Sequence, residues 1–148
     1  MDYIIIDNID QINFFECYSG NVLALGNNLL APLANIYIME KGEKKNSFLN
    51  YHEKSYLSFC FLFISNIETI TFNYDLKHLL NENSPKCFYF ENIFTGHGAE
   101  FWASYESVKF IIPSNSKFLK LPQTYSRKEC YDEIINNPIT ENIISLIK

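Results

Sequence analysis

Apolar residues in this chain gather in short runs or alternate strictly with polar ones, and this pattern predicts a protein built mainly from β-strands. The segment SYLSFCFLFIS (55–65) is apolar almost throughout, as is typical of a central strand covered on both faces. The segment ETITFNY (68–74) alternates instead, which places its apolar side chains on one face. The Ser65–Asn66 step between the two segments favours a tight antiparallel turn, so we expect them to pair.

Further β-prone segments precede and follow this pair. The segment 21–41 predicts two strands, interrupted at Asn27–Asn28 and at Pro32. CFYFENI (87–93) and EFWASYESVKFIIPS (100–114) predict an antiparallel pair whose connection is FTGHGA. The segment SKFLKL (116–121) has two lysines, which are typical of a strand at a sheet edge. Shorter strands are expected at residues 2–6, 11–19 and 116–121.

Only the C-terminal part of the chain has a helical pattern. A helix is predicted over residues 126–137, because Ser126 and Glu129 stand at the spacing of a capping box. Pro138 then takes a first-turn position in a second predicted helix, 138–148, whose isoleucines fall on one face.

The composition fits one folded domain. Of the 148 residues, 47% are hydrophobic and 20% are charged, and no break in composition divides them. Aromatic residues make up 16%, which favours sheet. We therefore expect a single domain, residues 1–148, of the α+β class. Its sheet would be mainly antiparallel and strongly curved, half-barrel or sandwich-like, with one or two C-terminal helices.

The charge of the chain argues against some partners and favours others. The formal net charge is −5 and Arg127 is the only arginine, so nucleic acid is not expected as a direct partner. An acidic domain is attracted instead to a basic one. The start MDYIIIDNID has too short an apolar run for a secretory signal or a membrane span, so we expect a cytoplasmic protein without membrane contact. The four cysteines form no CxxC pair and are expected to be reduced and mostly buried.

The stretch IFTGHGAEFW (93–102) is the segment most like an active site, because His97 lies between two glycines and Glu100 follows. A metal site would need further ligands, and no HxH or HExxH spacing supplies them. Thr95, His97 and Glu100 have the side chains of a nucleophilic triad, but one loop rarely presents all three convergently. We therefore expect a hairpin loop whose glycines permit positive φ and whose histidine faces water, or else contacts a partner. No catalytic residue, metal or cofactor is expected.

Three carboxylates bracket the same predicted hairpin: Glu91, Glu100 and Glu106. Paired carboxylates serve as acid and base in glycosidases, but strand surfaces carry them routinely. A solvated face is therefore the first expectation, and an acidic binding face is the second. Trp102 is expected in the core. The candidate partner-binding residues are Glu91, His97, Glu100 and Glu106.

Within residues 20–112 the chain combines LLAPLANIYIMEK, the aromatic strand YLSFCFLFI and the hairpin FENIFTGHG…FWASYESVKF, and an amphipathic tail follows. Together these segments resemble the immunity proteins encoded beside bacterial contact-dependent growth-inhibition and other polymorphic toxins. The resemblance implies a non-enzymatic protein that binds a cognate toxin domain 1:1 in the cytosol and blocks its active site. Such toxins are often basic nucleases, which an acidic inhibitor would meet through complementary fields and buried aromatic anchors.

Two other functions stay open on the residues alone. A small apolar ligand could be carried in an aromatic-lined barrel or half-barrel. That function requires a continuous cavity lined by Phe59, Phe61, Phe63, Phe88 and Phe90. A small hydrolase or nuclease would instead use the His97 loop.

Overall fold

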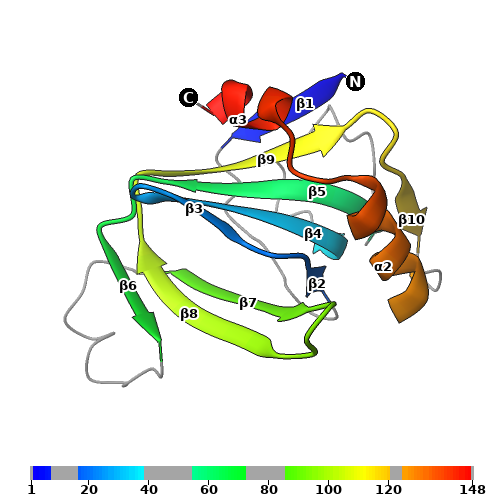
Figure 1. Cartoon of the computed structure of the whole chain (residues 1–148), viewed down its shortest axis with the longest axis horizontal. Helices are drawn as coiled ribbons and strands as arrows, with labels where there is room; N and C mark the ends of the chain where they lie inside the picture. Colours follow the sequence, from blue (N-terminus) through cyan, green and yellow to red (C-terminus); the bar gives the residue numbers. More distant parts are fainter. Residues whose placement is uncertain (1, 8–16, 39–54, 73–85, 121–124, 148) are drawn as a thin grey trace, which may run out of the picture.

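The computed structural model describes residues 2–7, 17–38, 55–72, 86–120 and 125–147, which form one mixed, mainly antiparallel β-sheet with two helices (Figure 1). The helices are α2 (Arg127–Asn136) and α3 (Glu141–Ile147). The strands are β1 (Tyr3–Asp7), β2 (Tyr18–Ser19), β3 (Leu23–Leu25), β4 (Asn28–Ile38), β5 (Ser55–Ser65), β6 (Thr69–Phe72), β7 (Lys86–Asn92), β8 (Gly98–Ser104), β9 (Ser107–Pro113) and β10 (Phe118–Lys120). The expected α+β class, with a curved sheet and C-terminal helices, is confirmed.

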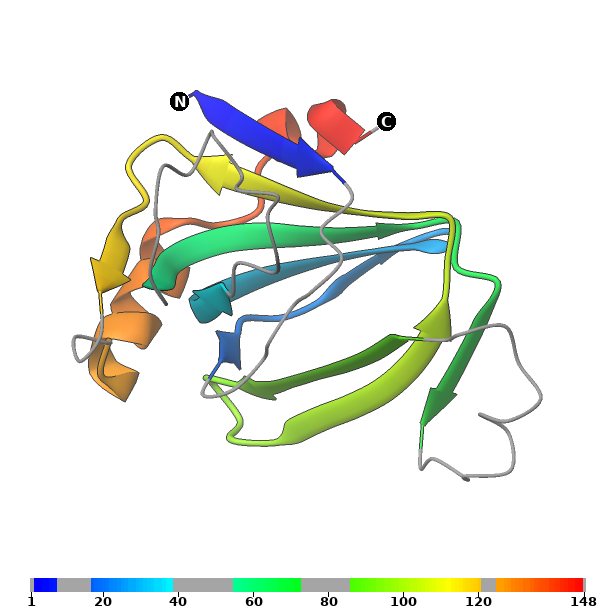
Figure 2. The same cartoon turned by 180° about the vertical axis from the view of Figure 1, so that it is seen from behind.

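The sheet is open and bends into two layers. Its strand order is β1-β9-β5-β4-β2-β7-β8-β6, with β10 paired to β5 and β3 paired to β4. In Figures 1 and 2, strands β9, β5, β4 and β3 form an upper layer, whereas β7, β8 and β6 form a lower one. Two connections cross between the layers at the same end of the molecule, from β5 to β6 and from β8 to β9. At the opposite end, β2 pairs in parallel with the last residues of β7.

The two crossings contradict two sequence predictions. The hairpin predicted between β5 and β6 is wrong, because β6 pairs with β8. Asn66, at a φ of 50°, turns the chain towards the lower layer, and its backbone N–H donates to Asn28 Oδ1 at 2.8 Å. The segment 100–114 is likewise not a single strand. It breaks at Tyr105–Glu106, so β8 belongs to the lower layer and β9 to the upper.

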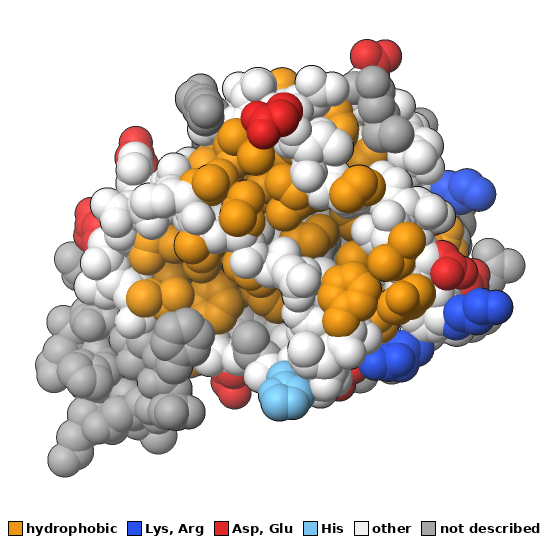
Figure 3. Space-filling model, in the orientation of Figure 1, with side chains coloured by type: hydrophobic (Ala, Val, Ile, Leu, Met, Phe, Trp, Pro, Cys, Tyr) orange, Lys and Arg blue, Asp and Glu red, His pale blue; other side chains and the backbone are white. Residues whose placement is uncertain are grey.

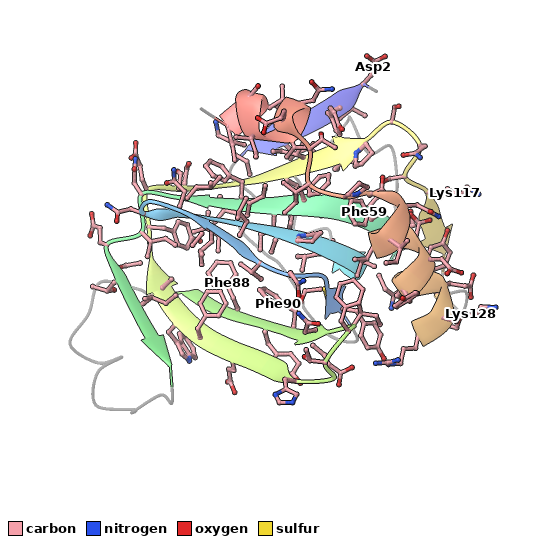
Figure 4. All side chains as sticks on the ribbon, in the orientation of Figure 1. Asp2, Phe59, Phe88, Phe90, Lys117 and Lys128 are labelled. Atoms are coloured by element: carbon pink, nitrogen blue, oxygen red, sulfur yellow. The ribbon has the colours of Figure 1, made fainter. Side chains whose placement is uncertain are left out.

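Two apolar cores lie on opposite faces of the upper layer. The interlayer core includes Cys60, Leu62, Ile64, Phe88, Phe90 and Phe101. The helix-side core includes Phe59, Phe61, Phe63, Cys130, Ile134 and Ile143. Figure 4 shows Phe59 near α2, and Phe88 and Phe90 between the layers. Residues 57–64 of β5 are all buried, so the predicted central strand covered on both faces is confirmed.

Strand β4 continues through Pro32, where we predicted an interruption. The Pro32 carbonyl accepts a hydrogen bond from the Gly20 N–H at 2.9 Å. Because the nitrogen and the carbonyl of one strand residue point to the same side, the Pro32 nitrogen also faces this side of β4. On that side the ladder is interrupted between β2 and β3, and the missing proline N–H therefore costs no strand hydrogen bond. The predicted break near Asn27–Asn28 is confirmed as the turn from β3 into β4.

At Asn35 the side chains of β4 change the face on which they lie, so residues two apart contribute to different cores. Its φ of 60° lies in the left-handed region, which reverses the alternation of side chains along the strand. Ala34 therefore packs in the helix-side core, whereas Ile36 packs in the interlayer core. The buried Asn35 Oδ1 accepts from the Tyr125 N–H at 3.2 Å, which ties the chain entering α2 to the sheet.

The start of α2 matches the sequence prediction better than the start of α3 does. The capping box is confirmed: Ser126 Oγ accepts from the Glu129 N–H at 3.2 Å, and Glu129 Oε1 accepts from the Ser126 N–H at 3.1 Å. The second helix begins three residues later than predicted, since residues 138–140 precede α3 and are not helical. Ile143 of α3 is buried in the helix-side core, as its spacing predicts.

Some of the remaining sequence predictions are confirmed, and one lies partly outside the described residues. Strands β1 and β10 are confirmed, whereas residues 11–16 of the predicted strand 11–19 lie outside the described residues. Cys17, Cys60 and Cys130 are buried free thiols, and burial raises the pKa of Cys130 to about 12. Within the described chain, neither helix is long and apolar enough to cross a membrane.

Candidate partner-binding surface

The loop between β7 and β8, residues 93–97, is held in one conformation by Asn92. Asn92 Oδ1 accepts from the N–H groups of Phe94 and Thr95 at 2.9 and 3.1 Å. The Asn92 carbonyl accepts from the Gly96 N–H at 2.8 Å, and Gly96 has a φ of 75°. The expected positive φ is therefore right for Gly96. It is wrong for Gly98, which is the first residue of β8.

Gly98 has a different role, because the ring of Tyr89 lies beside it. A Cβ atom at Gly98 would come within 3.2 Å of the Tyr89 hydroxyl oxygen and 3.4 Å of Tyr89 Cε2. The glycine thus lets the tyrosine lie close to the neighbouring strand. This conformation leaves the Tyr89 side chain 46% exposed on the surface of the hairpin.

The loop is also fastened to the rest of the fold. The Arg127 guanidinium of α2 donates to the Ile93 carbonyl at 3.0 Å, and the Ile93 N–H donates to the Ser19 carbonyl of β2 at 2.8 Å. Asn92 Nδ2 donates to Asn21 Oδ1 at 3.2 Å. Because these bonds reach two different elements, the loop has a fixed position over β2 and α2.

His97 and its neighbours are exposed at the end of this hairpin. The His97 N–H donates to Thr95 Oγ1 at 3.2 Å, and both side chains are exposed, as is that of Glu100. Among the described residues, no three histidine, cysteine or carboxylate side chains gather in a way that could hold a metal ion. The end of the hairpin is therefore an exposed polar surface.

We call the outward surface of β7 and β8 the open face, formed by Tyr89, Glu91, Glu100 and Trp102. The alternate residues Phe88, Phe90 and Phe101 point into the interlayer core, so these four lie on the other side of the strands. The helices pack instead on the face of the upper layer that points away from the interlayer core, and α2 lies beside β4 and reaches β2 (Figure 1). Trp102 is half-buried on this surface rather than in the core, which corrects the sequence prediction.

Three of the four candidate residues lie at one end of the open face, and the fourth does not. Glu91 pairs with Gly98 beside His97, and Glu100 pairs with Tyr89. Glu106 lies past the other end of the seven-residue strand β8, which separates it from the loop by about 20 Å or more at roughly 3.3 Å per residue. Its carboxylate accepts a hydrogen bond from Asn66 Nδ2, so its described contact stabilises the crossing between the layers.

A second exposed surface adjoins the loop, and the sequence analysis missed it. We call it the α2 patch, formed by Phe94, Tyr131 and Ile135. Phe94 and Tyr131 are 44% and 42% exposed, and their rings meet edge to face with centroids 5.7 Å apart. Figure 3 shows hydrophobic side chains gathered on the surface over this part of α2. The signal was the spacing of Tyr131 and Ile135, which adds a second apolar stripe beside the buried one of α2.

The described structure does not form the cavity that an apolar-ligand carrier would need. Three of the five phenylalanines expected to line it belong to the helix-side core and two to the interlayer core. A pocket of about 300 Å³ lies elsewhere, at the crossings between the layers. Its lining comes from the turn between β3 and β4 and the start of β6: Gly26, Asn27, Asn28, Leu29, Ile67, Glu68 and Ile70.

Comparisons with known proteins identify no relative of this chain. No protein-family model, curated protein sequence or solved structure matches the chain.

Proposed function

We propose that this protein is an immunity protein, which binds a cognate toxin domain 1:1 in the cytosol and blocks the toxin's active site. The observation that carries the proposal is the unequal covering of the sheet. Helices cover the outer side of the upper layer, whereas the open face of the lower layer presents Tyr89, Glu91 and Glu100. Aromatic side chains with a polar end are enriched at protein interfaces, where they supply rigid contact area.

Charge supports a basic partner. The chain has a formal net charge of −5, and the open face contributes Glu91 and Glu100 beside Tyr89. A nuclease must hold phosphates, so the rim of its active site is basic and would attract this face. Complementary charge raises the association rate and positions the inhibitor over the groups that bind nucleic acid. The resemblance across residues 20–112 to immunity proteins supports the same function.

The direct test is co-expression with the toxin domain encoded by the adjacent gene. We expect wild-type protein to restore growth and to form a 1:1 complex, measured by calorimetry on the purified pair. The double variant Glu91→Lys and Glu100→Lys should weaken binding by at least about tenfold, since tenfold corresponds to about 1.4 kcal/mol.

Glu141→Lys is the control for charge reversal away from the open face, and it changes the net charge by half as much as the double variant. Glu141 is an exposed glutamate in the first turn of α3, on the helix-covered side of the molecule, so its reversal alters net charge without altering the open face. It should reduce binding far less than the double variant. Failure of the wild-type protein to protect cells or to bind the toxin domain would refute the proposed function.

A further inference from the structure

We infer that the toxin interface continues from the open face around the β7–β8 loop onto the α2 patch, where an apolar segment of the same toxin domain docks. This inference rests on the proposed function. It assigns to the partner two kinds of surface: a basic one against Glu91 and Glu100, and an apolar one against Phe94, Tyr131 and Ile135.

Continuity between the two surfaces is the first argument. Phe94 belongs to the short loop that joins the two strands of the open face, and the same loop carries His97. Arg127 bonds the loop to α2 through the Ile93 carbonyl at 3.0 Å. A domain seated at the loop end of the open face therefore reaches the α2 patch without crossing any other helix or strand that the structure describes.

The second argument is that the patch is already held in shape. The Phe94 ring lies near Gly20, where a Cβ atom would be 3.8 Å from Phe94 Cε2 and 2.8 Å from Ile134 Cγ2. The buried Ile134 thus supports the helix directly behind the exposed Tyr131 and Ile135. Side chains fixed before binding lose little conformational entropy when a partner covers them. Tyrosine is also one of the residue types that most often dominate binding energy.

The third argument is the area of the patch, which is too small for a separate partner or a second copy of this chain. Three partly exposed side chains offer on the order of a few hundred Å², whereas a stable interface takes about 800 Å² from each partner. A dimer of this chain, or a separate partner, would need more surface than the patch provides. The patch meets the requirement as the apolar part of a larger contact that includes the open face.

The test measures association and dissociation rates with the toxin domain encoded by the adjacent gene, using Tyr131→Ala and, separately, Ile135→Ala. We expect Tyr131→Ala to raise the dissociation rate by about 10- to 100-fold, with an unchanged association rate and salt dependence. The open-face double variant should instead slow association and flatten its salt dependence. Leu146→Ala is the matched control, because Leu146 is an exposed helical residue at 44%, close to the 50% of Ile135.

The outcomes separate the inference from the proposed function. If both α2-patch variants dissociate like the Leu146→Ala control while the open-face variant binds weakly, the inference is refuted and the proposed function stands. If the wild-type protein does not bind the toxin domain, both are refuted. A wild-type dimer that Tyr131→Ala converts to monomer would assign the patch to self-association and would also refute the inference. Unfolding midpoints near that of wild type check that each variant is folded.

Discussion

The upper and lower layers belong to one sheet, yet their strands are built from different kinds of sequence. Strand β5 of the upper layer has cores on both faces, and its residues 57–64 are buried without exception. Strand β7 of the lower layer buries Phe88 and Phe90 and exposes Tyr89 between them. A continuous apolar run thus marks a strand that is covered on both faces, whereas alternation marks a strand with one face exposed.

The largest effect should come from truncating an aromatic side chain that belongs to the covered layer. Phe59→Ala removes a fully buried ring that packs edge to face on Phe61 with centroids 5.0 Å apart. We expect a loss of about 3–5 kcal/mol in the free energy of unfolding, measured by denaturant titration. Tyr89→Ala on the open face should cost less than about 1 kcal/mol. Equal losses at the two positions would contradict the distinction between the layers.

Asn35 tests how β4 supplies both cores. Asn35→Ala should destabilise the protein by about 2–4 kcal/mol, because alanine disfavours positive φ and the Tyr125 N–H loses its acceptor. Asn35→Gly restores the backbone freedom but not the acceptor, so it should recover part of the loss. The measurement is again the free energy of unfolding. A glycine variant less stable than the alanine variant would show that the left-handed conformation is not the main constraint.

A smaller effect is expected where the covering helix begins. Ser126→Ala removes the side-chain acceptor for the Glu129 N–H and should cost about 1 kcal/mol. Ser145→Ala is the control, because the Ser145 hydroxyl donates to the Glu141 carbonyl within α3 and caps no helix terminus. It should change the unfolding free energy by less than about 0.5 kcal/mol. Thermal unfolding followed by circular dichroism compares the two.

The smallest effect is a pH dependence at the same helix terminus. Hydrogen bonds from the backbone and side chain of Ser126 lower the pKa of Glu129 below its usual value of 4.5. A carboxyl group with a lowered folded pKa stabilises the folded state above its unfolded pKa and loses that contribution as the pH falls through the folded value. Stability should therefore decrease slightly more steeply below pH 4.5 in wild type than in Glu129→Gln. Parallel pH profiles for the two proteins would contradict this assignment.

Much of the fold could be predicted from local pattern. The capping box at Ser126 and the β7–β8 hairpin join residues close in sequence, and the central strand β5 is marked by its own continuous apolar run. The two crossings could not be predicted in this way. Whether the chain turns back on itself at Asn66 or passes to another layer depends on the distant Asn28, which accepts the Asn66 N–H.

The candidate surface shows the same division between local and distant information. Glu91, His97 and Glu100 lie together because a hairpin brings them together, and hairpins have a sequence signal. Glu106 is separated from them because the strand breaks at Tyr105–Glu106. The pairing of Phe94 with Tyr131 required the tertiary packing of α2 against the loop, which nothing near Phe94 in the sequence indicates.

The parallel pairing of Tyr18 and Ser19 with Glu91 and Asn92 has a consequence for the order in which the sheet closes. These partners lie far apart along the chain, so joining them costs more loop-closure entropy than forming the hairpins on either side. We expect this short ladder to form late in folding and, in the native state, to open more often than the fully buried β5. Hydrogen exchange should then be faster at the Glu91 and Ile93 amides than in β5. A toxin domain bound across the loop would stabilise the closed ladder and slow exchange at those two amides.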